Sequence, residues 1–227
     1  MPLLYIDKID DNTQLGAWLF DKSTNLKDVC PSDVYNRTMT MCNNRQKETA
    51  AVYALLNEML GRGGWIIDHE HSGRPILRGS DMEIGISHTK NYASIILSRH
   101  KRVAVDIEYI SDRIFKIEDK FMRSDERDYS LTLCNNINIS DDAHINKAYI
   151  LLLFWCTKET MYKYYSDEHL ALHDIMIERI TESNKYEGSI ICKNTLNGET
   201  QTLIYKVNDN TVLTYLVQNE SGSEPND

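Results

Sequence analysis

The alternation of apolar and polar residues along the chain predicts short strands interspersed with helices. Apolar residues three and four positions apart between Arg45 and Leu60 are typical of an amphipathic helix, and Gly61 supplies its stop signal. Further helical segments are predicted at 31–41, 111–133 and 148–165. Segments rich in β-branched and aromatic residues predict strands at 3–9, 16–21, 65–68, 76–78, 92–97, 188–193, 202–207 and 211–218.

Turn-forming residues divide these elements. Asn197-Gly198 and the segment 208–210 separate the last three strands, which predicts an antiparallel meander. The segment 134–146 is rich in Asn, Asp and Ser and predicts a loop. Residues 219–227 lack apolar side chains, which predicts a disordered tail. We therefore expect a mixed fold of the α+β class.

Two carboxylates stand two residues apart at the end of the apolar run Val103 to Glu108. Because alternate side chains of a strand share a face, Asp106 and Glu108 are expected to project together while Val105 and Ile107 point into the core. Two such acids repel each other unless a positive charge lies nearby, and Mg2+ meets this need because it prefers carboxylate oxygens. Taken alone, however, this spacing is more typical of a strand that leaves the core for an acidic turn.

Two other segments carry residue types that suit a bound phosphate. A strand predicted to end at Ser87 is followed directly by His88. In the predicted helix at 148–165, Glu159 and Lys163 lie one turn apart on the same face, with Lys158 adjacent. Together with the acid pair, these residues predict a site for a metal-bound polyphosphate.

At these positions the chain resembles the 4′-phosphopantetheinyl transferase superfamily, specifically its surfactin-synthetase-activating type. The resemblance covers residues 70 to 165, where the order and approximate spacing of the motifs agree with the family. One departure is Ala104, where the family usually has glycine, and this small change in a buried strand leaves both acids intact. The matching pieces are Gly73-Arg74-Pro75, Ile86-Ser87-His88, Val105-Asp106-Ile107-Glu108, Phe121 with Glu126, and Trp155 with Lys158, Glu159 and Lys163.

The resemblance implies a fold and an activity. The expected fold has two similar α/β halves related by a pseudo-twofold, at 1–100 and 101–218 with a junction near His100, and the active site in the cleft between them. Such a chain is expected to be a monomer in which the two similar halves form a pseudo-dimer. The expected reaction moves the phosphopantetheine arm of coenzyme A to a serine of an apo carrier protein (acyl, peptidyl or aryl) and releases adenosine 3′,5′-bisphosphate.

The resemblance also implies roles for individual residues. By motif match Asp106 and Glu108 are the Mg2+ ligands, and Glu159 is the third. Lys158 or Glu159 would assist removal of the serine proton, and the sequence leaves both open. The expected contacts to coenzyme A phosphates are Arg74, Ser87, His88 and Lys163, with Arg45 and Lys47 as weaker candidates at a helix start.

Bulk properties restrict the setting. The net charge of −9 argues against non-specific nucleic-acid binding, which rests on neutralising phosphates. No apolar run is long enough to span a membrane, and the start of the chain lacks the pattern of a signal peptide. The five scattered cysteines favour free thiols in a reducing compartment. We therefore expect a cytoplasmic protein that binds neither nucleic acid nor membrane.

A basic stripe is expected to receive the acidic carrier protein. Positions 113, 116, 120, 123 and 127 are Arg, Lys, Lys, Arg and Arg, a spacing that places them on one face of a continuous helix. Phe121 and Met122 would add apolar contacts.

Two alternatives to the transferase remain open from the sequence: a metal-dependent phosphodiesterase that acts on coenzyme A or a nucleotide, and an inactive carrier-binding scaffold. Trp155 is expected to be a core residue without a chemical role.

Overall fold

The computed structural model of the chain describes residues 3–20, 24–208 and 210–218. Within these ranges the fold is mixed α/β, with helices packed on two antiparallel sheets of six and five strands. The first sheet ends at Ser98 and the second begins at Val103, so the two sheets divide where the sequence predicted a junction. The predicted tail at 219–227 lies outside the described residues.

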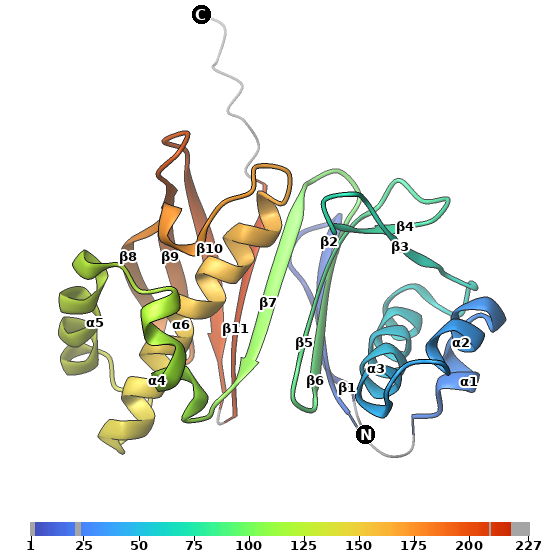
Figure 1. Ribbon diagram of the computed structural model, residues 1–227, viewed down its shortest axis with the longest axis horizontal. Coiled ribbons are helices and arrows are strands. Elements are labelled where there is room, and N and C mark those ends of the chain that lie inside the picture. The colour runs from blue at the N-terminus through green and yellow to red at the C-terminus, as the bar shows by residue number, and fades with distance from the viewer. Residues whose placement is uncertain (1–2, 21–23, 209, 219–227) are drawn as a thin grey trace, which may run out of the picture.

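The N-terminal sheet carries a long helix on one face (Figure 1). The apolar stripe of α3 (Asn43–Leu60) packs Leu55 and Leu56 against Ile84, Ile95 and Trp18 of this sheet. Two shorter helices, α1 (Leu26–Val29) and α2 (Ser32–Thr38), lie beside α3. The strand order is β1 (Leu3–Lys8), β2 (Thr13–Leu19), β6 (Tyr92–Ser98), β5 (Glu83–Thr89), β4 (Pro75–Leu77) and β3 (Ile67–His69).

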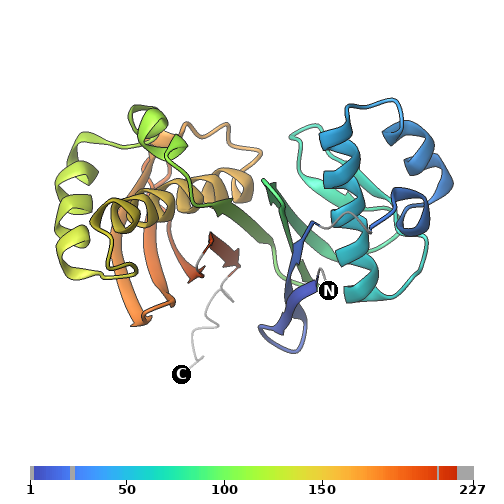
Figure 2. The same ribbon diagram turned by 90° about the horizontal axis from the view of Figure 1, so that it is seen from below.

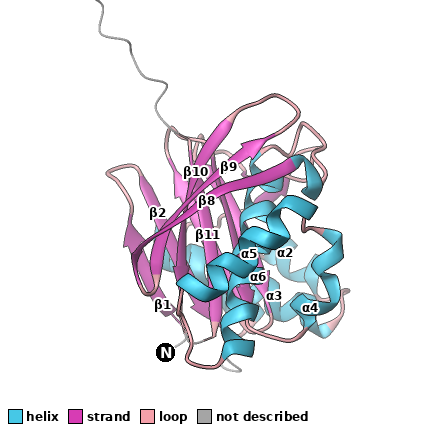
Figure 3. Ribbon diagram, turned by 90° about the vertical axis from the view of Figure 1, so that its left-hand side faces the viewer, coloured by secondary structure: helices cyan, strands magenta, loops and turns pink. Residues whose placement is uncertain are grey.

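The C-terminal sheet is covered by the longest helix, α6 (Ala143–Tyr164), which packs on the strands nearest the junction (Figure 2). The Asp142 side chain caps α6 by accepting hydrogen bonds from the backbone of His144 and Ile145. The helices of both halves lie on the same side of the strands (Figure 3). The strand order is β7 (Val103–Tyr109), β11 (Thr211–Val217), β10 (Thr200–Val207), β9 (Glu187–Asn194) and β8 (Ile175–Asn184). None of the helices that the structure describes is long and apolar enough to cross a bilayer.

The two sheets share an apolar core. Val105 and Ile107 of β7 are buried together with Leu15 and Ile96 of the N-terminal sheet, as the alternation of the β7 sequence predicted. An ion pair of 2.5 Å between Lys206 Nζ and Asp7 Oδ2 joins β10 to β1 at the rim of this core. The halves are therefore packed against each other rather than linked only by the chain.

Strands β5 and β7 lie side by side at the junction and run in the same direction. Gly85 lies beside Ala104, and the side chain of Ser87 reaches Asp106. A Cβ atom added to Gly85 would lie 3.2 Å from the Ala104 Cα and 2.8 Å from Ile96 Cγ2. Glycine at position 85 therefore permits the close approach of the two strands.

Several predicted elements differ from the observed ones. Strand β5 continues to Thr89 rather than ending at Ser87, because His88 and Thr89 pair with β6. Strand β8 was not predicted. The expected loop at 134–146 is shorter, since α5 (Ser124–Asn136) and α6 extend into it from either side.

The prediction of one continuous helix over 111–133 is wrong. The segment forms α4 (Arg113–Ile117), the 3-10 turn η1 (Glu118–Lys120) and α5, with a break at 121–123. Phe121 and Met122 are buried in the C-terminal core at this break, so they are unavailable as contacts for a partner. The five basic residues of the stripe therefore do not share one helical face.

We expect Gly85→Ala to destabilise the protein, because its new methyl group must push β5 away from β7. Overpacking of this kind costs about 1–3 kcal/mol, which urea unfolding at neutral pH would measure. A Gly85→Ala variant with wild-type stability would contradict the close approach of the two strands.

Candidate functional site

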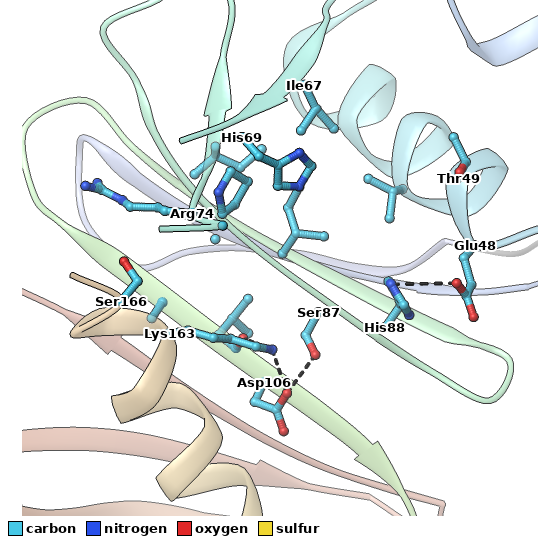
Figure 4. A pocket seen from close by; sticks show the side chains of 18 of the residues that line it. Glu48, Thr49, Ile67, His69, Arg74, Ser87, His88, Asp106, Lys163 and Ser166 are labelled. Carbon is cyan, nitrogen blue, oxygen red and sulfur yellow. Dashed lines mark hydrogen bonds and ion pairs between the residues drawn. The ribbon is translucent and has the colours of Figure 1, made fainter. Parts of the chain in front are cut away.

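A cleft of about 890 Å³ lies between the two halves, and both halves line it (Figure 4). One wall comes from α3 and β5, and the other comes from β7 and α6. Of the residues predicted from the sequence, the cleft brings together Arg45, Arg74, Ser87, His88, Asp106, Glu108, Glu159 and Lys163.

Asp106 is the most deeply buried acid of the cleft, with 4% of its surface exposed. Its Oδ1 accepts hydrogen bonds from Lys163 Nζ and from the Ser87 hydroxyl, at 2.7 and 2.8 Å (Figure 4). Its Oδ2 is buried and has no hydrogen-bond partner among the described residues. A buried carboxylate oxygen without a donor is costly unless a ligand meets it, so Oδ2 is a candidate ligand atom.

Glu108 is held from both walls. Its Oε2 accepts from the Thr89 hydroxyl at 2.7 Å, and its Oε1 accepts from the Trp155 indole at 3.1 Å. Burial raises the pKa of Glu108, and the neighbouring Asp106 carboxylate raises it further. The acid pair therefore lies on one face of β7, as the sequence predicted.

Glu159 and Lys163 come from one face of α6. Trp155, Glu159 and Lys163 are spaced by four residues, and all three line the cleft. Burial raises the pKa of Glu159 from 4.5 to about 7, with a further contribution from the Asp106 carboxylate. Lys163 opposes this increase but does not cancel it. Glu159 therefore titrates near neutral pH.

A polar cluster connects α3 to β5 on the other wall. Arg45 Nη1 lies 3.0 Å from Glu48 Oε2 and 3.2 Å from His88 Nε2, so one guanidinium contacts both side chains. His88 Nε2 is also 3.8 Å from Glu48 Oε2 (Figure 4). Burial lowers the pKa of His88, as do Arg45 and Lys163, whereas Glu48 raises it. A neutral imidazole that accepts from Arg45 is consistent with this balance.

Arg74 lies at the end of the cleft near Ser166 (Figure 4). Its guanidinium is ion-paired with the Glu83 carboxylate. Burial lowers the pKa of Arg74, and the nearby charge of Arg102 contributes to the decrease. Arg74 thus lines the cleft from the Gly73 turn, with its charge compensated by Glu83.

The structure does not place Lys158 in the cleft. Lys158 is fully buried and forms an ion pair of 2.7 Å with Glu126, and its ammonium group donates to the Phe121 and Leu172 carbonyls at 2.8 and 3.2 Å. Successive residues of a helix point about 100° apart, so Lys158 faces α5 while Glu159 faces the cleft. The prediction of Lys158 as a proton acceptor therefore loses its geometric basis.

Two other expectations also need correction. Lys47 is exposed on α3 and does not line the cleft, because it follows Arg45 by two residues and faces another side of the helix. Trp155, expected to have no role beyond the core, donates its indole hydrogen to Glu108.

Glu48 and Thr89 contact predicted site residues, although the sequence did not predict either as part of the site. Thr89 was detectable, since it follows Ser87 by two residues and therefore shares its face of β5. Glu48 carries no comparable signal, because a glutamate within a helix is common and nothing in the sequence marks it as facing the cleft.

The acids fit a hard cation in their chemistry. Among the described residues, no three histidine, cysteine, aspartate or glutamate side chains are grouped closely enough to hold a metal ion by themselves. Magnesium, however, commonly takes only one or two carboxylates and completes its shell with water and substrate phosphates. The unpartnered Oδ2 of Asp106, next to Glu108, matches this type of site.

We expect Lys158→Met to lower stability by about 3–5 kcal/mol, because it leaves the buried Glu126 carboxylate without its counter-ion. Adding Glu126→Gln should recover part of this loss. Urea unfolding measures both effects, and Lys8→Met, which breaks the exposed pair with Asp11, is the control that should change little. Wild-type stability in Lys158→Met would contradict a structural role for the ion pair.

The raised pKa of Glu159 also predicts a pH dependence of stability. The folded protein holds this proton up to about pH 7, whereas the unfolded chain releases it near 4.5. The free energy of unfolding should therefore fall between these values in the wild type relative to Glu159→Gln. The two proteins should be equally stable below pH 4.5, and the variant should be the more stable above pH 7. A constant difference in urea unfolding from pH 4 to pH 8 would contradict the shift.

No protein-family model matches the chain, and no curated protein matches it. The chemistry of the cleft is therefore the basis for a proposed function.

Proposed function

We propose that the protein transfers the 4′-phosphopantetheine arm of coenzyme A to a serine of an apo carrier protein. The observation that carries this proposal is the composition of the cleft. Acids of β7 and α6 face basic residues of α3 and β5 across a space of about 890 Å³. Ligand clefts of several hundred cubic ångströms suit molecules of nucleotide size. Basic groups opposite acids suit a polyphosphate that carries a divalent cation.

The arrangement of the chain supports a pseudo-dimeric fold for this enzyme. Each half has an antiparallel sheet with a long helix on it, α3 in residues 1–100 and α6 in residues 101–218. We propose that the halves are related by a pseudo-twofold and act as a single-chain monomer in the cytoplasm. In this proposal the first half binds coenzyme A phosphates and the second carries the metal acids.

Four basic residues of the cleft are proposed to hold the phosphates of coenzyme A. Arg74, Arg45 and His88 come from the N-terminal half, and Lys163 comes from α6. Charge-assisted hydrogen bonds from the two arginines and Lys163 are worth about 1.5–3 kcal/mol each, and His88 would add a neutral contact. Because they lie on both walls, they can fix the orientation of the pyrophosphate relative to the incoming serine.

Asp106 and Glu108, with Glu159 facing them, are the residues that would hold Mg2+. When bound, the ion would neutralise charge that develops on the leaving phosphate. The Asp106 Oδ2 atom, which is buried and lacks a donor among the described residues, supports this assignment. Lys163 contacts Asp106 Oδ1, which positions its ammonium group beside the same phosphates.

Glu159 is the proposed acceptor of the serine proton. Its carboxylate lines the cleft from α6, opposite the wall that is proposed to hold the phosphates. Lys158 is not proposed for this step, because its ammonium group is buried against Glu126. The carrier serine would attack the phosphorus on the pantetheine side, and the bond to the adenosine 3′,5′-bisphosphate would break.

The partner surface is smaller than the sequence predicted. Arg123 pairs with Asp125 and Arg127 pairs with Glu118 and Asp119, so both charges are already compensated. Arg113, Lys116 and Lys120 are exposed on α4 and η1 directly after β7, and we propose them as the contact for an acidic carrier helix. Electrostatic attraction of this kind would be screened by salt over about 10 Å at 0.1 M.

Intact-mass measurement of a panel of apo carrier proteins, incubated with the protein, coenzyme A and Mg2+, tests the proposal. We expect a mass gain of one phosphopantetheine on at least one carrier, and its loss in Asp106→Ala and Glu108→Ala. Thr13→Val is the control that should retain the activity, since Thr13 contacts Ser98 and neither residue lines the cleft.

The same assay separates the alternatives. Release of adenosine 3′,5′-bisphosphate without any carrier would contradict transfer and identify a phosphodiesterase. Binding of a carrier without any mass gain would instead identify an inactive scaffold.

A further inference from the structure

Two hydroxyl groups of β5 contact the two acids of β7. The Ser87 hydroxyl donates to Asp106 Oδ1 at 2.8 Å, and the Thr89 hydroxyl donates to Glu108 Oε2 at 2.7 Å. Each donor precedes its acceptor by 19 residues, so one parallel alignment of β5 with β7 makes both contacts. The orientation of each acid is thus set by a strand from the other half.

The Ser87 contact also limits what Ser87 can do. A hydroxyl group has a single hydrogen, and that of Ser87 is directed at Asp106 (Figure 4). Its oxygen accepts from the backbone nitrogen of Ile107 at 3.2 Å, so the side chain is fixed from two directions. In this geometry Ser87 supports Asp106 and has no hydrogen left to donate to a phosphate, which corrects the expectation that Ser87 contacts coenzyme A.

Glu108 is restrained at both of its oxygens, and the two donors come from different halves. Thr89 belongs to β5, whereas Trp155 belongs to α6 and holds the opposite oxygen at 3.1 Å. The Trp155 ring is itself fixed by an edge contact with the buried Phe121, at 5.3 Å between ring centres. A carboxylate oxygen has two lone pairs, so each oxygen of Glu108 retains one for a further ligand.

We infer that Ser87, Thr89 and Trp155 are positioning residues that fix the Asp106 and Glu108 carboxylates for a divalent cation. This inference rests on the proposed function, because it takes the two acids as the cation ligands. Donors behind metal-binding side chains commonly change metal affinity or activity by about 10- to 100-fold when they are removed. The N-terminal half therefore contributes to the cation site without supplying a ligand.

The sharpest test uses Thr89, whose hydroxyl can be removed with little change of shape. Mn2+ serves as the probe, since electron paramagnetic resonance measures its binding without coenzyme A or carrier. Thr89→Val should weaken Mn2+ binding by about 10-fold or more, and Thr89→Ser, which keeps the hydroxyl, should restore it. Thr13→Val is the matched control, because it removes a buried hydroxyl whose partners, Ser98 and Asp10, do not line the cleft.

A double-mutant cycle shows whether Thr89 acts through Glu108. In a Glu108→Gln background, Thr89→Val should have little further effect on Mn2+ affinity. An equal loss of affinity in both backgrounds, or wild-type affinity in Thr89→Val, would overturn the inference. The carrier assay tests the transferase proposal separately. If the carriers stay unmodified while the Mn2+ results are as expected, the transferase proposal is rejected and the positioning role of Thr89 stands.

Discussion

The packing of β7 against the N-terminal sheet is the contact on which the rest of the structure depends. Val105 and Ile107 are buried there with Leu15 and Ile96, so both halves lose apolar surface to water through one strand. Because side chains of a strand alternate, burying these residues forces Asp106 and Glu108 to the other face, toward α6 and the cleft. The same strand thus joins the halves and presents the acids.

Lys158 and Lys163 of α6 have different surroundings because they lie on different faces of the helix. Lys158 and Lys163 are five residues apart, and the first is buried with Glu126 whereas the second reaches Asp106 in the cleft. Burial lowers the pKa of Lys158, although this residue does not line the cleft. A perturbed pKa is therefore insufficient to identify a functional lysine, since a buried structural ion pair produces the same effect. The position of the lysine relative to the cleft distinguishes a functional lysine from a structural one.

The cleft carries most of its acids on one wall and basic residues on the other, although Lys163 pairs with Asp106 on the acidic wall. Acids concentrate on β7 and α6, while Arg45, His88 and Arg74 lie on the N-terminal wall, each near a glutamate. Burial raises the pKa of both Glu108 and Glu159, which reflects the cost of holding several carboxylates together away from water. A phosphate-bound cation would relieve that cost on one wall and satisfy the basic residues on the other. The ligand proposed above would therefore match the charges on both walls.

Local patterns in the sequence determined the helix α3 and most strands. They also determined that Asp106 and Glu108 share a face of β7 and that Glu159 and Lys163 share a face of α6. Each of these outcomes follows from helix or strand periodicity. Only the tertiary structure decided that Lys158 faces Glu126, that the segment 111–133 breaks at Phe121, and that Trp155 and Thr89 hold Glu108. These outcomes depend on which neighbour each face meets. Periodicity defines the faces of an element, but contacts between residues distant in the chain select the face that is buried and the face that lines the cleft.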